Sequence, residues 1–168
     1  MKLEKSRNIS NQVKSRNVTL VKITEDSKEY RMALKVRKEY FFQGVEIDLE
    51  SCIYDEFEND SCHFGLKSTR TDQLIGYLRI NYLSSSVVLL SQLLLVEEER
   101  TIDNIRFFYR SVESYLREKG VELITASARL VYLPVYKLAG FKLIGERYKS
   151  VKTGIWHQRI QKKIKHFN

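Results

Sequence analysis

The chain has 168 residues, a length that fits one domain able to bury its own hydrophobic core. Hydrophobic residues make up 43% and charged residues 30% of the sequence, which is ordinary for a soluble globular protein. The longest apolar run, Val87 to Val96, is interrupted by Ser91 and Gln92 and is too short to span a bilayer. The formal charge is +8, but no RNA-binding aromatic motif, zinc-finger spacing or clear helix-turn-helix accompanies it. A solvated basic surface is therefore expected, rather than a nucleic-acid partner.

The cysteines and the start of the chain indicate the compartment. Cys52 and Cys62 have neither CxxC nor paired Cys/His spacing, so we expect no metal and a reduced, cytoplasmic setting. The first residues are charged and have no apolar stretch of signal-peptide length. We expect a polar N-terminal arm over residues 1–17 and a single soluble domain over residues 18–168.

The first part of the chain predicts a strand, then a helix, then a segment rich in acidic and aromatic residues that has no assigned structure. These elements cover residues 18–24, 27–42 and 45–60. Asp26 or Ser27 is suited to cap the start of the helix, and Gly44 is expected to end it.

The rest of the chain predicts an antiparallel pair of strands, a third strand that is apolar on both faces, and then alternating helices and strands. The strands are expected at 62–68, 74–80, 87–96, 121–127, 141–148 and 156–164, and the helices at 102–119 and 131–139. Thr101 is the predicted N-cap and Gly120 the predicted C-cap of the longer helix. This order predicts an α/β (α+β) protein with a mixed sheet, antiparallel at its start and parallel where helices intervene, with strand 87–96 at its centre.

A candidate catalytic residue lies near the C-terminus. Residues 124–141 predict a buried strand, a short helix that carries Tyr136, a glycine stop and a new strand. A phenol just beyond the end of a strand is suited to donate a proton to a leaving group. The alternative is a core tyrosine whose hydroxyl has a protein partner.

Three motifs follow one another in a fixed order along the chain. They are Arg37-Lys-Glu-Tyr-Phe-Phe with Tyr54-Asp-Glu-Phe-Glu and His63, then Val135-Tyr-Lys-Leu-Ala-Gly-Phe, then Thr153-Gly-Ile-Trp-His. With the order of elements, they resemble the GNAT (Gcn5-related N-acetyltransferase) superfamily, the first and third motifs resembling a small bacterial subgroup of it. The resemblance implies the GNAT fold, with a mixed sheet of about six to seven strands and about four helices.

The resemblance also implies an activity, the transfer of an acyl group from acetyl-CoA or another acyl-CoA to a primary amine by direct attack on the thioester. By this resemblance, Tyr136 would protonate the departing thiolate. Glu97 is the candidate general base, and a solvated acidic run, Glu97 to Glu99, is the alternative reading. The implied donor-binding residues are Leu93, Leu94, Leu95, Val96, Arg100, Thr101, Ile102, Asp103, Asn104 and Ile105.

One loop departs from the GNAT pattern. GNAT enzymes bind the pyrophosphate with R/Q-x-x-G-x-G/A at a helix N-terminus, where free N–H groups and the helix dipole favour an anion. This chain has Arg100, but Asp103 and Ile105 fill the two glycine positions, and Asp103 adds a negative charge. The chain could hold CoA differently, through Arg100, Arg106 and the basic surface.

Two alternatives therefore stay open. The donor could be an acyl chain on an acyl-carrier protein, whose single phosphate needs no pyrophosphate loop and whose acidic surface suits a basic enzyme. Motifs of autoinducer and N-acyl amino acid synthases, which are GNAT relatives that use such donors, resemble Arg37-Lys-Glu-Tyr-Phe, Tyr54-Asp55 and Ser91-Gln92, although Gln92 replaces their arginine. The second alternative is a catalytically silent GNAT-fold module that binds a ligand or partner.

The acceptor is expected to be a small-molecule or amino-acid amine, but no specific motif identifies it. Candidate substrate-binding residues are Arg37, Phe41, Asp55 and His157. For His157, a structural role is the alternative, and Asp55 could instead pair with nearby lysines. A homodimer is compatible with the resemblance, because paired domains are common in this superfamily.

Overall fold

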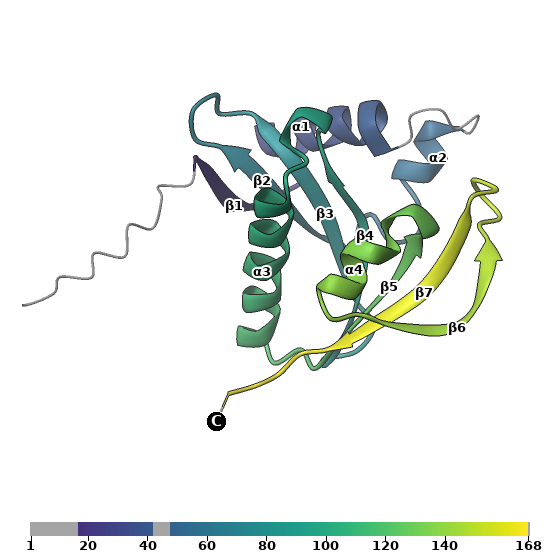
Figure 1. Ribbon diagram of the computed structural model, residues 1–168. Coiled ribbons are helices and arrows are strands. Elements are labelled where there is room, and N and C mark those ends of the chain that lie inside the picture. Colours follow the sequence, from purple (N-terminus) through teal and green to yellow (C-terminus); the bar gives the residue numbers. More distant parts are fainter. Residues whose placement is uncertain (1–16, 42–47, 168) are drawn as a thin grey trace, which may run out of the picture.

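The computed structural model describes residues 17–41 and 48–167, and within them a seven-stranded sheet has the order β1-β2-β3-β4-β5-β7-β6 (Figure 1). The strands are β1 (Val18–Ile23), β2 (Cys62–Ser68), β3 (Leu74–Tyr82), β4 (Val87–Leu95), β5 (Leu123–Arg129), β6 (Lys142–Lys149) and β7 (Trp156–Lys163). The α-helices are α1 (Lys28–Val36), α2 (Leu49–Ile53), α3 (Ile102–Glu118) and α4 (Leu133–Leu138). A π-helical turn, η1 (Arg37–Phe41), continues α1, and two 3-10 turns are η2 (Glu97–Glu99) and η3 (Leu130–Tyr132).

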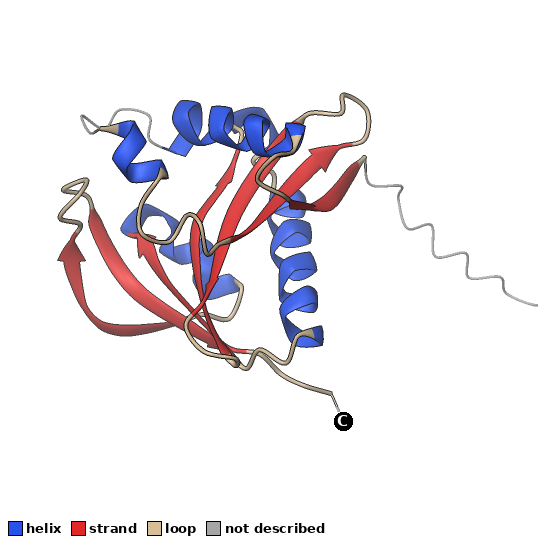
Figure 2. Cartoon of the chain, turned by 180° about the vertical axis from the view of Figure 1, so that it is seen from behind, coloured by secondary structure: helices blue, strands red, loops and turns tan. Residues whose placement is uncertain are grey.

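Helices cover both faces of the sheet (Figures 1 and 2). On one face α1 packs against β3 and η1 against β4, around a small core that includes Tyr77 and Leu94. On the other face α3 and α4 close the main core, to which α3 contributes one apolar stripe: Phe108, Tyr109, Val112 and Leu116. Burial on both faces explains why β3 and β4 have nearly continuous apolar sequences.

Local capping sets the ends of the two long helices. The Ser27 hydroxyl accepts a hydrogen bond from the backbone N–H of Tyr30, and the Thr101 hydroxyl accepts one from that of Asn104. Helix α3 ends at Lys119, and the following Gly120 adopts a left-handed conformation with φ of 79°. The predicted N-caps Ser27 and Thr101 and the predicted helix stop at Gly120 are confirmed.

Strands β4 and β5 are parallel neighbours that stay together only at one end. The register pairs Val87 with Leu123 and continues to Leu90 with Ala126. Beyond that point β4 remains paired with β3, and β5 remains paired with β7 as far as Arg129 opposite His157. Among residues 17–41 and 48–167, no strand pairs with the β5-facing edge of β4 beyond that point.

A bulge in β4 coincides with this separation. The β3–β4 register shifts between Tyr77 and Arg79, and Gln92 has a φ of 55°, a left-handed value that is uncommon for a residue other than glycine. The bulge also changes which residues face α3. Leu90 belongs to the main core before the bulge and Leu95 after it, although strict alternation would not place both on one face.

The predicted fold class is confirmed, including the antiparallel start and the parallel β4–β5 pair. The order of the last strands differs from simple parallel succession, because β7 lies between β5 and β6 and pairs antiparallel with both. Helix α2 forms where no element was assigned, with the Asp48 carboxylate as its N-cap. The predicted arm up to residue 16 and the predicted helix stop at Gly44 lie outside the described residues.

Candidate active site

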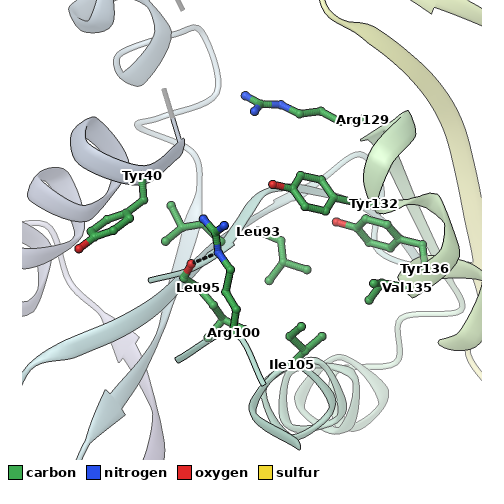
Figure 3. A pocket seen from close by; sticks show the side chains of 10 residues that line it. Tyr40, Leu93, Leu95, Arg100, Ile105, Arg129, Tyr132, Val135 and Tyr136 are labelled. Carbon is green, nitrogen blue, oxygen red and sulfur yellow. Dashed lines mark hydrogen bonds between the residues drawn. The ribbon is translucent and has the colours of Figure 1, made fainter. Parts of the chain in front are cut away.

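A pocket opens between the separated ends of β4 and β5 (Figure 3). The pocket measures about 680 Å³, a volume that includes space open to solvent. Its lining residues are Tyr40, Leu93, Leu94, Leu95, Arg100, Ile105, Arg129, Tyr132, Val135 and Tyr136. The pocket therefore joins the free edge of β4 to the segment that contains Tyr136.

Two phenols form one wall of the pocket, and their hydroxyls point into it (Figure 3). Tyr132 ends η3 and Tyr136 lies one helical turn later in α4, so both side chains lie on one side of this segment. The ring of Tyr136 packs edge-to-face on Phe141, with centroids 5.3 Å apart. The backbone N–H of Phe141 also donates to the Tyr136 carbonyl at 3.0 Å, across the turn at Gly140. These contacts fix the ring and leave the hydroxyl in the pocket.

The Tyr136 hydroxyl is chemically suited to donate a proton. Burial, and secondarily the neighbouring Tyr132 phenol, raise its pKa above the ordinary value of a tyrosine. The phenol is therefore protonated at neutral pH. Within the part of the chain that the structure describes, the Tyr136 hydroxyl makes no hydrogen bond to protein, so its proton is available to a bound molecule.

The charged side chains among the lining residues are two arginines. Arg100 follows β4, and its Nε donates to the carbonyl of Leu95 at 2.8 Å. Arg129 ends β5 on the phenol side of the pocket, and burial lowers the pKa of its guanidinium. No aspartate or glutamate is among the described lining residues. The charged groups of the described lining are thus both cationic.

The N-terminus of α3 is already occupied by its own side chains. Besides the Thr101 cap, the Asn104 side-chain amide donates to the Glu99 carbonyl at 3.0 Å and to the Glu99 carboxylate at 3.2 Å. Asp103 is exposed in the first turn of the helix, and Glu97 and Glu98 precede it on η2. A pyrophosphate at this helix end would meet these carboxylates, so Arg100 is the residue best placed to offset their charge.

A buried ion-pair network lies beside the β4 wall. The Arg37 side chain is 0% exposed, and its guanidinium donates to both oxygens of Glu58 at 2.7 and 2.8 Å. Arg79 of β3 donates to Glu58 at 2.9 Å and to the two oxygens of Asp55 at 2.9 and 2.7 Å. Two guanidinium groups thus share two carboxylates, and the four charges balance.

The network also makes hydrogen bonds to side chains of β4 at its bulge. The Nε of Arg37 donates to the Gln92 side-chain carbonyl at 2.8 Å, and the Nε of Arg79 donates to the Ser91 hydroxyl at 3.1 Å. Gln92 is the residue with left-handed φ, immediately before Leu93 of the pocket wall. The network therefore holds the backbone that shapes this wall.

Glu58 makes the stability of this network depend on pH. Burial alone would raise the pKa of its carboxyl, but hydrogen bonds and charge from Arg37, with further hydrogen bonds from Tyr30 and Arg79, outweigh burial and lower the pKa to about 2. Its contribution to stability is therefore complete above the unfolded-state pKa of about 4.3 and is lost as pH falls toward 2.

We expect the urea midpoint of the wild-type protein to exceed that of Glu58→Gln at pH 6, and the gap to narrow steadily as pH falls from 5 toward 2. Urea unfolding followed by circular dichroism at a series of pH values measures this gap. A gap that stays constant or widens toward acid would show that the Glu58 charge does not stabilise the fold.

The structure brings five of the predicted donor-binding residues to the pocket: Leu93, Leu94, Leu95, Arg100 and Ile105. The other five lie beside it, with Val96 bonded through its N–H to β3 and Thr101, Ile102, Asp103 and Asn104 at the start of α3. Glu97 is exposed on η2 and does not line the pocket. Its predicted role as a base stays a prediction.

The predicted substrate-binding residues have separate locations. Arg37 and Asp55 belong to the buried network and not to the lining. His157 is half-buried on β7, directly across from Arg129. The backbone of Phe41 ends η1, but its side chain lies outside what the structure describes. Contacts between these residues and a substrate stay predictions.

Sequence reasoning missed Tyr40, Arg129, Tyr132 and Val135 as lining residues. Tyr132 and Tyr136 are spaced by four residues, the spacing that places side chains on one side of a helical segment. That spacing was a usable signal once Tyr136 had been singled out. Tyr40 reaches the pocket from η1, on the other side of β4, which no local pattern indicates.

Residues 17–41 and 48–167 contain no cluster of three or more His, Cys, Asp or Glu side chains able to hold a metal ion. None of the helices in these ranges combines the length and the apolar character needed to cross a bilayer.

Comparison with known proteins identifies the fold. No family model and no curated protein matches the sequence. Among solved structures, a Lactobacillus plantarum protein proposed to be an N-acetyltransferase has a TM-score of 0.74 at 15% identity, over 88% of this chain and 98% of that one. The N-acyl amino acid synthase FeeM from uncultured soil microbes has a TM-score of 0.69 at 16% identity, over 88% of this chain and 91% of that one.

A GNAT family acetyltransferase from Elizabethkingia anophelis, solved with acetyl-CoA bound, has a TM-score of 0.64 at 11% identity, over 88% of this chain and 99% of that one. These coverages span almost all of each neighbour, so the likeness extends over the whole fold. The chain has the GNAT fold.

Proposed function

We propose that this protein is an N-acyltransferase that moves an acyl group from a thioester donor to a primary amine. The observation that carries the proposal is the Tyr136 hydroxyl, which is protonated, has no hydrogen-bond partner among the described residues and points into a pocket beside β4. Support also comes from the fold, because structural neighbours include N-acetyltransferases and an N-acyl amino acid synthase.

The proposed reaction uses the two walls of the pocket. The donor's thioester carbonyl would bind a backbone N–H on the edge of β4 that faces the pocket, within Leu93 to Leu95, which stabilises the oxyanion that forms when the amine attacks. The amine nitrogen forms the new bond to the carbonyl carbon, and the carbon–sulfur bond then breaks. Tyr136 gives its proton to the departing thiolate and later regains one from solvent. The amine's proton leaves to a base, for which Glu97 acting through water remains the candidate.

Acyl-CoA is the first proposed donor. It would lay its pantetheine arm between β4 and α4, with Arg100 offsetting the charge of the pyrophosphate. Two structural neighbours were solved with acetyl-CoA or coenzyme A.

An acyl-carrier protein is the second proposed donor, and the N-terminus of α3 favours it. This helix end is capped by Thr101 and surrounded by Glu99 and Asp103, so it offers a pyrophosphate little of the usual anion site. An acyl chain on a carrier protein has a single phosphate instead of a pyrophosphate, so it does not need that anion site. The neighbour FeeM is an N-acyl amino acid synthase, which agrees with an acceptor of the amino-acid class.

Thiol release tests the proposal and separates the donors. The protein would be incubated with acetyl-CoA, with octanoyl-CoA, or with the octanoyl chain on an acyl-carrier protein, each in the presence of a mixture of amines and amino acids. We expect amine-dependent thiol release with at least one donor, and the fastest release identifies the donor class. Binding of a donor without release under any of these conditions would instead support the silent binding module.

A further inference from the structure

A groove lies beside the pocket and joins it. Its walls are α3 and α4, which lie side by side on one face of the sheet (Figure 1), together with Lys162 of β7. The groove measures about 1240 Å³, a volume that includes space open to solvent. Ile105 and Val135 line both the groove and the pocket, so a molecule seated in the groove can extend a chain into the pocket. We call this feature the α3–α4 groove.

The charge of the α3–α4 groove is mainly positive. Its described lining contains one carboxylate, Glu113, and four cationic side chains: Arg106, Arg110, Arg117 and Lys162. Glu113 pairs with Arg117 at 3.1 Å and with Lys162 at 2.7 Å. Arg106 and Arg110 are exposed and lie one helical turn apart, and neither side chain forms an ion pair or a hydrogen bond within residues 17–41 and 48–167. Their guanidinium groups can therefore bind the carboxylates of a partner.

This positive charge lies beyond the start of α3, where a pyrophosphate would bind. Glu99 and Asp103 surround that helix end. The cationic positions of the groove follow about one to four turns later, along a helix of 17 residues that is about 25 Å long. Positive charge then continues into an adjoining hollow lined by Arg117, Lys162 and Lys163. The cationic face is thus longer than one phosphate group needs, and its length suits the surface of a protein.

Exposed apolar side chains lie among these cations. Leu138 of α4 is 90% exposed and lines both the groove and the adjoining hollow, and Ile102 of α3 is 71% exposed and lines the groove. Arginines around an exposed apolar centre are typical of protein–protein interfaces. A small anion would use the guanidinium groups but would leave Leu138 in water, whereas a partner protein would cover it.

We propose that the α3–α4 groove is the docking site of an acidic acyl-carrier protein. The carrier places acidic side chains against Arg106 and Arg110 and apolar contacts on Leu138, while its acyl thioester enters the pocket past Ile105 and Val135. Opposite charges favour such a partner, and a basic protein would meet like charges here. This inference rests on the proposed acyl transfer, favours the second of its two donors and assigns the surface that recognises it.

Binding of an apo acyl-carrier protein, which lacks the phosphopantetheine arm, tests the docking surface apart from the chemistry. We expect the apo carrier to bind the wild-type protein, and the double variant Arg106→Glu/Arg110→Glu to weaken this binding by at least about tenfold. Fluorescence anisotropy of the labelled carrier measures the dissociation constant. Leu138→Ser should weaken binding by about threefold or more, and its 90% exposure makes it harmless to the fold.

Arg31→Glu/Lys35→Glu is the matched control. Arg31 and Lys35 are exposed and four residues apart on α1, which covers the other face of the sheet. The control therefore changes the net charge by the same amount at the same spacing, and it should change carrier binding by less than about twofold. Equal losses in the two double variants would show that only net charge matters, which would overturn the assigned surface.

Octanoyl-CoA separates the carrier's surface from the phosphates of the donor. Its dissociation constant should change by less than about threefold in Arg106→Glu/Arg110→Glu, because Arg100 is the cation nearest the pocket. An equal loss for octanoyl-CoA and the carrier, or no binding of the apo carrier to wild type, would overturn the inference and leave acyl transfer from CoA intact. Carrier binding that depends on Arg106 and Arg110 would support the inference even if no donor released thiol.

Discussion

Replacing Tyr136 with phenylalanine should lower the rate of the chemical step by about 100- to 10,000-fold, the usual contribution of a positioned general acid. The donor's dissociation constant should change by less than about twofold, because phenylalanine keeps the ring that packs on Phe141. Without the phenol, the thiolate must leave unprotonated. Single-turnover thiol release with saturating donor measures this step, and calorimetry measures donor affinity.

Tyr132→Phe is the matched control, because Tyr132 lines the same pocket from the preceding turn and is 43% exposed. We expect it to slow the chemical step by less than about tenfold, since a more exposed phenol is replaced more easily by water. If Tyr136→Phe retains the wild-type rate and Tyr132→Phe does not, Tyr132 is the acid and the assignment of Tyr136 is wrong.

Glu58→Gln should lower the free energy of unfolding by about 3–5 kcal/mol, because it leaves the guanidinium groups of Arg37 and Arg79 buried without their shared carboxylate. Urea unfolding at pH 7 measures the loss. Glu56→Gln is the control on the same loop. The Glu56 carboxylate is exposed and lies 4.0 Å from exposed Lys152, so its removal should cost less than about 1 kcal/mol.

Tyr30→Phe provides a milder variant in case Glu58→Gln does not fold. It removes only the 2.7 Å hydrogen bond from the Tyr30 hydroxyl to Glu58 and should cost about 1 kcal/mol. If Glu58→Gln destabilises the protein no more than Glu56→Gln does, the network does not hold the β4 wall and our account of it is wrong.

Features with local causes could be predicted from the sequence. Ser27 and Thr101 are short polar residues before amphipathic segments, and Gly120 follows the last apolar position of one, so the helix ends could be located. The apolar strand 87–96 indicated a central position, and the structure places β4 fourth of seven. The segment around Tyr136 combined a strand, a proline-started helix and a glycine stop, each recognisable alone.

Features that depend on distant pairing could not be predicted. β7 lies between β5 and β6 because it pairs with both of these strands. No local sequence pattern specifies that β7, and not β6, pairs with β5. Arg37 and Glu58 are separated in sequence by a segment without a regular pattern. Glu58 contacts both Arg37 and Arg79 only once the sheet has folded. The complete burial of Arg37, a predicted substrate-binding residue, could not be read from a basic helix face.

The central claim is that a thioester donor occupies the pocket between β4 and β5. Calorimetric titration of wild type, Val135→Trp and Val131→Trp with the three donors tests it most directly. Val135 is 40% exposed and lines the pocket, whereas Val131 is 73% exposed and does not. We predict that at least one donor binds wild type and Val131→Trp equally and that Val135→Trp, which fills the pocket, loses it. Equal binding to Val135→Trp, or binding of no donor to the folded wild-type protein, would contradict the claim.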